Sequence, residues 1–557
     1  MEKRAAETSV SPQTTSKPTR SSLLGTLIPD ASGIGKARAA TWLALFLVVG
    51  FGFTARARAL LAGRSLWLDE VVLATSIRDR GFVALLTEPL AFGQSAPPGF
   101  LVATKFFAEI FGTGLVWMRV VPFVSGVGTV LLAALFALRA FRRPSAQIAF
   151  VALASFSPTL VFYSAEMKQY STDAFAMMLA LYLSTYAREE LPSLRAAFLG
   201  FLAVISSLPG LFVFGALGLL LVSGRAPGPV GRRAVEQFRA NWAVLTSWAA
   251  GAAIHLVYSL VAGSDRARMK SWWGELNGFA PERVSGLSDL SWYSERFVEV
   301  FWLALENTRM VGPGTRNLDP LVLFATLALL ALAVSRPGPS ALTRPLLGAV
   351  ALLAWLLAEF ELYPLSSRLA IYLIPLVLAL VVLGYEAGRA SNTIGTKILV
   401  SAALLLITTT QASTALRQFD EPYIGRDMHG ALEVLRRDLG PSDLVVTNPA
   451  GLPIVEWHRA ARGLDFPLLV IHPDRIAEEF DRFLETEELP SRVWVIASHR
   501  QNEAASIAAA FAERYRFSSE YNRDGTYIAL SSALGPVELK PTGDRRLVEV
   551  VTEGAGQ

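Results

Sequence analysis

Two adjacent carboxylates, Asp69 and Glu70, directly follow the first long apolar stretch of this 557-residue chain. Carboxylates next to a membrane cost free energy unless they are paired or used in a reaction. A positioned carboxylate can act as a general base that takes a proton from a hydroxyl group. This pair therefore predicts a catalytic site, with an acidic marker of the membrane surface as the alternative interpretation.

A second polar group occupies residues 163–173, between two apolar stretches. If residues 164–173 are helical, Glu166, Tyr170 and Asp173 lie on one face, because they are spaced i, i+4 and i+7. Lys168 provides a compact positive charge of the kind that binds phosphate. The alternative is an ordinary polar turn.

Three further features lie near predicted membrane boundaries. The segment Gln94–Phe100 contains a Pro-Pro pair, which predicts a rigid entry into the apolar stretch 97–111, where Lys105 lies. Arg119 opens one apolar span and Arg368 opens another. Each arginine can pair with a lipid phosphate, or can be a structural arginine that snorkels or forms an ion pair.

Composition predicts the elements that position these residues. The chain is 52% hydrophobic and only 18% charged, its mean hydropathy is +0.41, and the charged residues concentrate after residue 414. About eleven apolar stretches approach the roughly 20 residues that cross a bilayer. The predicted spans are 40–60, 117–138, 145–163, 172–187, 195–209, 210–223, 240–262, 319–335, 345–361, 369–387 and 397–414. The expected fold is a polytopic all-α membrane body, residues 39–414, followed by a soluble α/β domain.

Loop charges predict the orientation of the body. Residues 1–38 are polar and basic, which favours a disordered cytoplasmic tail. With that end inside, the arginine-rich short turns fall on the cytoplasmic side, as the positive-inside bias requires. Two long loops, 61–116 and 263–318, and the C-terminal domain then lie outside. The stretch 97–111 is too short for a span and is expected to be an interfacial helix.

Residues 415–540 alternate strand-like and helical patterns, with expected strands at 443–447, 467–471, 493–497 and 526–531. These patterns predict an exported α/β domain with a partly parallel sheet, followed by a flexible tail at 541–557. Without a Gly-rich phosphate loop or a basic stripe, nothing favours nucleotide or nucleic-acid binding. The chain has no cysteine, and no motif demands a metal or another cofactor, although a divalent metal is compatible with the sequence.

Taken in order, the acidic pair, the Pro-Pro segment, Arg119, the polar cluster and Arg368 resemble the GT-C superfamily of integral-membrane glycosyltransferases. The pattern looks most like the branch of bacterial aminoarabinose transferases and protein O-mannosyltransferases, and it covers residues 40–414. That resemblance implies transfer of a sugar from a polyprenyl-phosphate donor to a lipid, glycan or protein acceptor. It further implies that the reaction takes place at the exported face of the bacterial inner membrane.

The resemblance assigns Asp69 as the general base and Glu70 as its acidic neighbour. It matches Arg119 and Asp173 to an arginine and an acidic residue of the family. The basic residue that relatives often carry before the Pro-Pro pair is Ala96 here, so Lys105, Lys168 or Arg368 are the candidates for the carrier phosphate. Gln94, Glu166 and Tyr170 complete the expected substrate site. A transporter or flippase for lipid-linked sugars and a polysaccharide ligase are the alternative functions.

Overall fold

The computed structural model describes most of the chain. The described residues are 36–186, 193–223, 230–262, 266–281, 286–305, 319–335, 343–422, 428–441, 443–485, 490, 492–497, 501–512, 516–523 and 526–532. Most of the predicted N-terminal tail, the whole predicted C-terminal tail and part of the 263–318 loop lie outside these residues.

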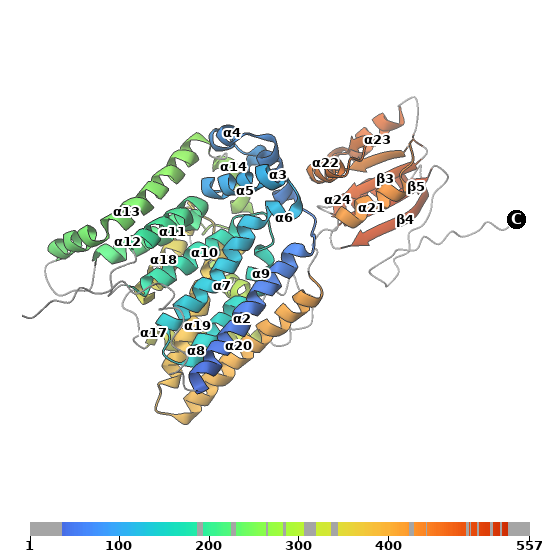
Figure 1. The fold of residues 1–557 in the computed structure, drawn as a ribbon. Helices are drawn as coiled ribbons and strands as arrows, with labels where there is room; N and C mark the ends of the chain where they lie inside the picture. Colours follow the sequence, from blue (N-terminus) through green and yellow to red (C-terminus); the bar gives the residue numbers. More distant parts are fainter. Residues whose placement is uncertain are drawn as a thin grey trace, which may run out of the picture.

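A bundle of α-helices forms the body (Figure 1). In chain order its longer helices are α2 (Lys36–Leu61), α7 (Val120–Ala140), α8 (Pro144–Phe156), α10 (Tyr170–Ser184), α11 (Ser193–Ser206), α12 (Leu208–Ser223), α13 (Val230–Val261), α14 (Arg266–Glu275), α15 (Leu287–Leu305), α17 (Asp319–Ser335), α18 (Thr343–Glu359), α19 (Ile374–Arg389) and α20 (Ile394–Asp420). Helix α10 is buried along almost its whole length and contacts α7, α11, α12 and α19. Close packing is clearest between α17 and α19, where a side chain on Gly384 would collide with the backbone of Leu329.

Five helices in the described part of the chain are long and apolar enough to cross a membrane: Arg38–Leu61, Val120–Ala140, Val235–Val261, Arg368–Arg389 and Ile394–Asp420. Four shorter apolar helices occupy other predicted spans: Pro144–Phe156, Ser193–Ser206, Leu208–Ser223 and Pro320–Ser335. The count of eleven spans thus remains a prediction.

The predicted span 145–163 is broken into two helices. Helix α8 ends at Phe156, and α9 (Pro158–Tyr163) begins after Ser157, whose side chain accepts a hydrogen bond from the Leu160 amide. A proline at the first position and a serine cap are strong helix-start signals, and proline cannot continue the preceding helix. The second helix delivers the chain to the 164–169 turn.

The first long loop folds into short helices at one end of the bundle. These are α3 (Leu68–Asp79), α4 (Phe82–Thr87), η2 (Ala91–Gly93), α5 (Pro98–Phe111) and α6 (Leu115–Met118). Helix α5 covers the stretch expected to be an interfacial helix and starts at the second proline of the Pro-Pro pair. Farther along the chain, the short helix η4 (Ser367–Leu373) leads into α19.

The C-terminal region folds around a five-stranded sheet of order β2-β1-β3-β5-β4. Its strands are β1 (Asp443–Thr447), β2 (Leu468–Val470), β3 (Arg492–Ala497), β4 (Arg516–Arg523) and β5 (Thr526–Ser532). Strand β1 pairs in parallel with β2 and β3, whereas β5 is antiparallel to both β3 and β4. Strand β4 was not expected, because its sequence RFSSEYNR lacks an apolar run.

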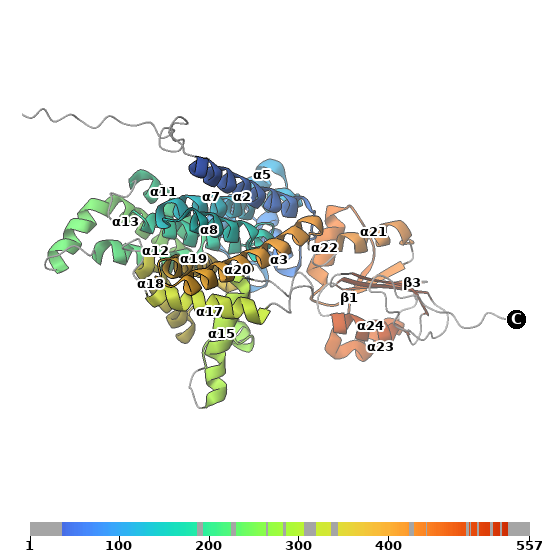
Figure 2. The same cartoon turned by 90° about the horizontal axis from the view of Figure 1, so that it is seen from below.

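Helices cover both faces of this sheet (Figure 2). Helices α21 (Met428–Asp438) and α22 (Leu452–Ala461) lie on one face, and α23 (Ile476–Leu484) and α24 (Gln501–Ala512) lie on the other, with the short η5 (Pro473–Arg475) before α23. Helix α22 also contacts α3 of the body. The C-terminal domain is thereby packed against the loop that carries the acidic pair.

Candidate active site

A cavity of about 650 Å³ lies where the body meets the C-terminal domain. Six of the ten predicted site residues line it: Asp69, Gln94, Lys168, Tyr170, Asp173 and Arg368. They come from α3, the 94–97 segment, the 164–169 turn, the start of α10 and η4. Residues far apart in the sequence therefore line the same cavity, and Trp272 and Trp273 of α14 line it as well.

The two carboxylates of the acidic pair face different surroundings. Asp69 lines the cavity, and its side chain keeps 18% exposure, whereas the side chain of Glu70 has none. Neighbouring residues on a helix point about 100° apart, so one side of α3 faces the cavity and the next faces the protein interior. Of the two carboxylates, Asp69 is the one that lines the cavity.

Asp69 is paired with a cation across the cavity. Arg368 Nη2 donates a 2.6 Å hydrogen bond to Asp69 Oδ2. The Arg368 guanidinium also lies over the rings of Trp67 and Trp273, 4.9 and 5.8 Å from their centroids. Within the described residues Arg368 Nε has no hydrogen-bond partner. Nε itself is covered by protein, but the Arg368 side chain keeps 26% exposure, so its terminal nitrogens can also donate to an anion in the cavity.

Lys168 supplies a second cation to the same cavity. Its Nζ donates a 2.5 Å hydrogen bond to Gln94 Oε1, which joins the 164–169 turn to the segment before the Pro-Pro pair. Burial lowers the pKa of Lys168, and the charge of Asp69 opposes that effect. Lys105, the other lysine considered for a phosphate, lies outside this cavity, where it pairs with Glu109 at 2.6 Å.

Polar oxygen atoms without partners lie along the cavity wall. Asp173 Oδ1 and Gln169 Oε1 are both buried and have no hydrogen-bond partner among the described residues. Buried polar atoms are nearly always paired in folded proteins. Both side chains belong to the cavity lining, but these two oxygen atoms are themselves covered by protein.

Behind the cavity, Glu70 and Arg119 form a buried ion pair. Two guanidinium nitrogens of Arg119 donate to Glu70 Oε1 at 2.9 and 3.0 Å, and the Met167 amide donates to the same oxygen at 2.6 Å. Arg119 Nη1 also donates to the carbonyl oxygen of Arg64 at 2.7 Å. The pair ties α3, the start of α7 and the 164–169 turn together, and neither residue lines the cavity.

Glu166 does not share a helical face with Tyr170 and Asp173. Residues 164–169 form a turn and α10 begins only at Tyr170, which corrects the conditional helix over 164–173. The Glu166 carboxylate accepts a 3.2 Å hydrogen bond from Trp67 Nε1 and lies 3.8 Å from Arg64. Burial, and next the charge of Glu70, raise the pKa of Glu166 to about 7.

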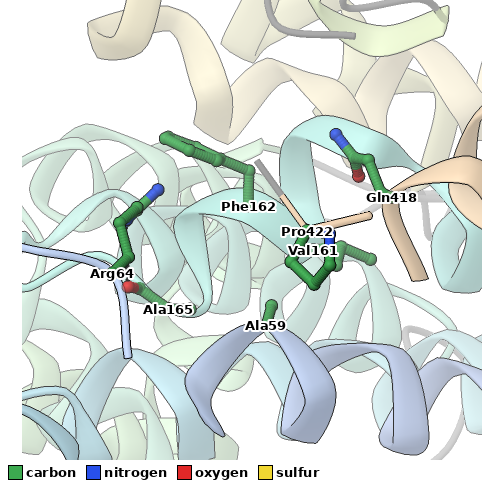
Figure 3. Close-up of a pocket in the computed structure, with 7 residues that line it drawn as sticks. All are labelled: Ala59, Arg64, Val161, Phe162, Ala165, Gln418 and Pro422. Carbon is green, nitrogen blue, oxygen red and sulfur yellow. Dashed lines mark hydrogen bonds between the residues drawn. The ribbon is translucent and has the colours of Figure 1, made fainter. Parts of the chain in front are cut away.

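A second, small pocket of about 20 Å³ is lined in part by Arg64 (Figure 3). In Figure 3, Arg64 and Ala165 stand on one side of it and Gln418, near the end of α20, on the other. Arg64 Nη2 donates to the Ala165 carbonyl oxygen at 2.9 Å. The volume is that of about one water molecule, so this pocket does not compete with the large cavity as a substrate site.

Several residues of the site carry no signal that singles them out in the sequence. Trp67 contacts both Arg368 and Glu166, and three residues of the C-terminal domain, Pro449, Ala450 and Pro453, form part of the cavity wall. In the sequence, the only indication that Trp67 belongs to the site is its position two residues before Asp69. In the described part of the chain, no group of three or more His, Asp or Glu side chains is placed to hold a metal ion.

Comparisons with known proteins give structural neighbours only. No protein-family model and no curated protein matches the chain. Two solved structures of ArnT from Cupriavidus metallidurans are similar to it: one bound to undecaprenyl phosphate (13% identity, TM-score 0.43) and one in the apo state (14% identity, TM-score 0.42). The alignments cover 89% and 88% of this chain, and 98% of each ArnT chain.

Proposed function

We propose that this protein is a membrane glycosyltransferase that moves a sugar from a polyprenyl-phosphate donor to an acceptor hydroxyl. One observation carries the proposal: a carboxylate, Asp69, and two cations, Lys168 and Arg368, line the same cavity. That is the set of groups needed to deprotonate a hydroxyl and to stabilise a departing phosphate.

In the proposed reaction the acceptor oxygen attacks the anomeric carbon of the donor sugar. Asp69 takes the proton of the acceptor hydroxyl as the new C–O bond forms. The bond between the anomeric carbon and the phosphate oxygen breaks, and its electron pair stays on the polyprenyl phosphate. Lys168 and Arg368 stabilise the charge on that phosphate as the bond breaks.

The ion pair between Arg368 and Asp69 belongs to the unliganded site. A donor phosphate competes with Asp69 for the guanidinium of Arg368, since both are anions that accept from the same N–H groups. Donor binding at Arg368 then leaves the Asp69 carboxylate open to the acceptor hydroxyl. The side chains of Asp173 and Gln169, which line the cavity, are the proposed partners for sugar hydroxyls.

The remaining predicted site residues have supporting parts in this proposal. Gln94 holds Lys168, and Tyr170 forms part of the wall beside Asp173. Glu70 and Arg119 fix the position of α3, and Glu166 holds Trp67. No step of the proposed reaction needs Lys105.

The test is incubation of the purified full-length protein with undecaprenyl-phosphate-linked pentoses and hexoses. A glycolipid, an oligosaccharide and a hydroxyl-bearing peptide serve as acceptors, and mass spectrometry follows the released carrier and the modified acceptor. Carrier release that requires the protein supports the proposal. A flippase would move the donor between leaflets without cleaving it, so lipid movement with intact donor would contradict the proposal.

A further inference from the structure

The C-terminal domain contributes directly to the large cavity. Pro449, Ala450 and Pro453, in the loop after β1 and the first turn of α22, line the same volume as Asp69 and Arg368. All three side chains are apolar, whereas the charged groups of the cavity come from the body. The body side thus holds charged groups together with apolar side chains such as Leu68 and Trp273, whereas the side formed by the C-terminal domain holds apolar side chains alone.

The domain is held on the body by a continuous hydrophobic core. Leu73 and Ile77 of α3 belong to the same buried cluster as Val455 and Trp457 of α22 and Trp494 of β3. The Arg78 guanidinium lies 4.5 Å from the centre of the Trp457 ring. A buried apolar contact of this kind is typical of a fixed interface rather than of a tethered domain.

Hydrogen bonds from the same domain reach the segment that leads into Asp69. The His429 amide donates to Ser65 Oγ at 2.9 Å, and His458 Nε2 lies 3.3 Å from the carbonyl oxygen of Leu66, to which it can donate. Burial and the neighbouring His429 lower the pKa of His458 to about 3, so the ring stays neutral. The body holds this segment from the other side, through Arg119 and the Arg64 carbonyl oxygen.

We infer that the C-terminal domain forms the acceptor side of the site and that Ala450 limits the size of the group admitted next to Asp69. The inference rests on the proposed transferase function. The acceptor must bring its hydroxyl to Asp69, and α22 packs on the helix that carries Asp69. A donor anchored in the membrane brings its phosphate to Lys168 and Arg368 on the body, which leaves the uncharged side formed by the C-terminal domain for the acceptor. The expected occupant of that side is an uncharged face of the acceptor, such as a sugar ring.

The absence of cysteine in the chain permits a test on protein that has already folded. Full-length Ala450→Cys is purified, then modified with methyl or benzyl methanethiosulfonate, and the mixed disulfide is later reversed with dithiothreitol. The matched control is Ala461→Cys, at the exposed far end of the same helix. The readout is the ratio of sugar transfer to the best acceptor of the panel over donor hydrolysis by water, the smallest acceptor.

The benzyl adduct at position 450 is expected to lower this ratio at least about tenfold, the methyl adduct less, and the thiol reductant to restore it. The adducts at position 461 should leave the ratio unchanged. Three results would overturn the inference. The ratio could stay unchanged in the benzylated Ala450→Cys protein, or it could fall equally in both variants. Mass spectrometry could also find that the thiol of Ala450→Cys does not react. Failure of the unmodified protein to cleave any donor is a different result, because it removes the proposed function and this inference with it.

Discussion

Arg368 and Asp69, which are 299 positions apart in the chain, meet at 2.6 Å across the cavity. The partner of the proposed base is thus one of the two groups proposed to receive the donor phosphate. In the proposed reaction, this contact couples binding of the donor to exposure of the base. The coupling predicts an order of events in which the donor binds before the acceptor hydroxyl is activated.

Asp69→Asn is expected to lower the rate of sugar transfer by about 10²–10⁴, because the amide cannot take the acceptor proton. Expression and the thermal unfolding temperature should stay near those of the parent protein, since the side chain remains polar and partly exposed. The rate is measured as carrier release under saturating donor. Asp79→Asn, at the other end of α3, is the matched control and should retain full activity.

Replacing either of the two cations proposed to bind the phosphate is expected to weaken carrier binding. Lys168→Gln and Arg368→Gln should each raise the Kd for undecaprenyl phosphate about tenfold or more, because a hydrogen bond to a charged group is worth about 1.5–3 kcal/mol. Lys105→Gln should not change it, since Lys105 lies outside the cavity and pairs with Glu109. Equal weakening by all three variants would contradict the assignment and indicate a general effect of charge.

Glu70→Gln is expected to destabilise the protein by about 3–5 kcal/mol, because it leaves the charge of Arg119 buried without its partner. Asp79, at the other end of α3, gives the contrast. Asp79→Asn removes one partner of the exposed Arg78–Asp79 pair and should cost less than about 1 kcal/mol. Thermal unfolding in detergent, followed by tryptophan fluorescence, separates the two results. Similar small losses would show that the Glu70–Arg119 pair does not hold α3.

The raised pKa of Glu166 predicts that the stability of the protein depends on pH. Its pKa is raised from 4.5 to about 7 in the folded protein, so between these pH values the folded state holds a proton that the unfolded state has lost. The free energy of unfolding therefore falls as pH rises through this window, by at most about 3 kcal/mol. Below about pH 4.5 both states hold the proton, and this part of the stability is fully present.

Glu166→Gln should flatten this part of the stability profile, because the amide does not titrate. Glu88→Gln is the control, since its side chain is 58% exposed. Unfolding temperatures measured from about pH 5 to about pH 8 check both variants. A slope that persists unchanged in Glu166→Gln would assign the effect to another group.

The residue types of the site could be predicted from the sequence, but their orientations could not. Asp69 and Glu70 are adjacent and chemically alike, yet one lines the cavity and the other pairs with Arg119 in the interior. Which of them faces the cavity depends on the rotation of α3, which is set by its packing against α5 and α22. From the sequence, Lys105 and Lys168 were equally suitable to bind a phosphate. In the structure, of these two only Lys168 lines the cavity.

In the C-terminal region, strands with a local apolar pattern could be predicted from the sequence. Apolar runs mark the positions of β1 and β3, which are buried strands, whereas the polar β4 gives no such signal. The contact between this region and the first loop has no local signal at all. The contact joins the apolar faces of α3 and α22. In the sequence, each of these faces looks like that of any helix that packs on a core, so neither indicates its partner.

That contact has a consequence for how the chain is made. His458 and the Leu66 carbonyl oxygen that it contacts are 392 positions apart, so the first loop is synthesised long before the surface that covers it. Until translation is nearly complete, the apolar side chains of Leu73 and Ile77 lack their partners from α22. A chain that stops after the last membrane helix is not a minimal form of the protein, because it leaves this surface uncovered and open to aggregation or proteolysis.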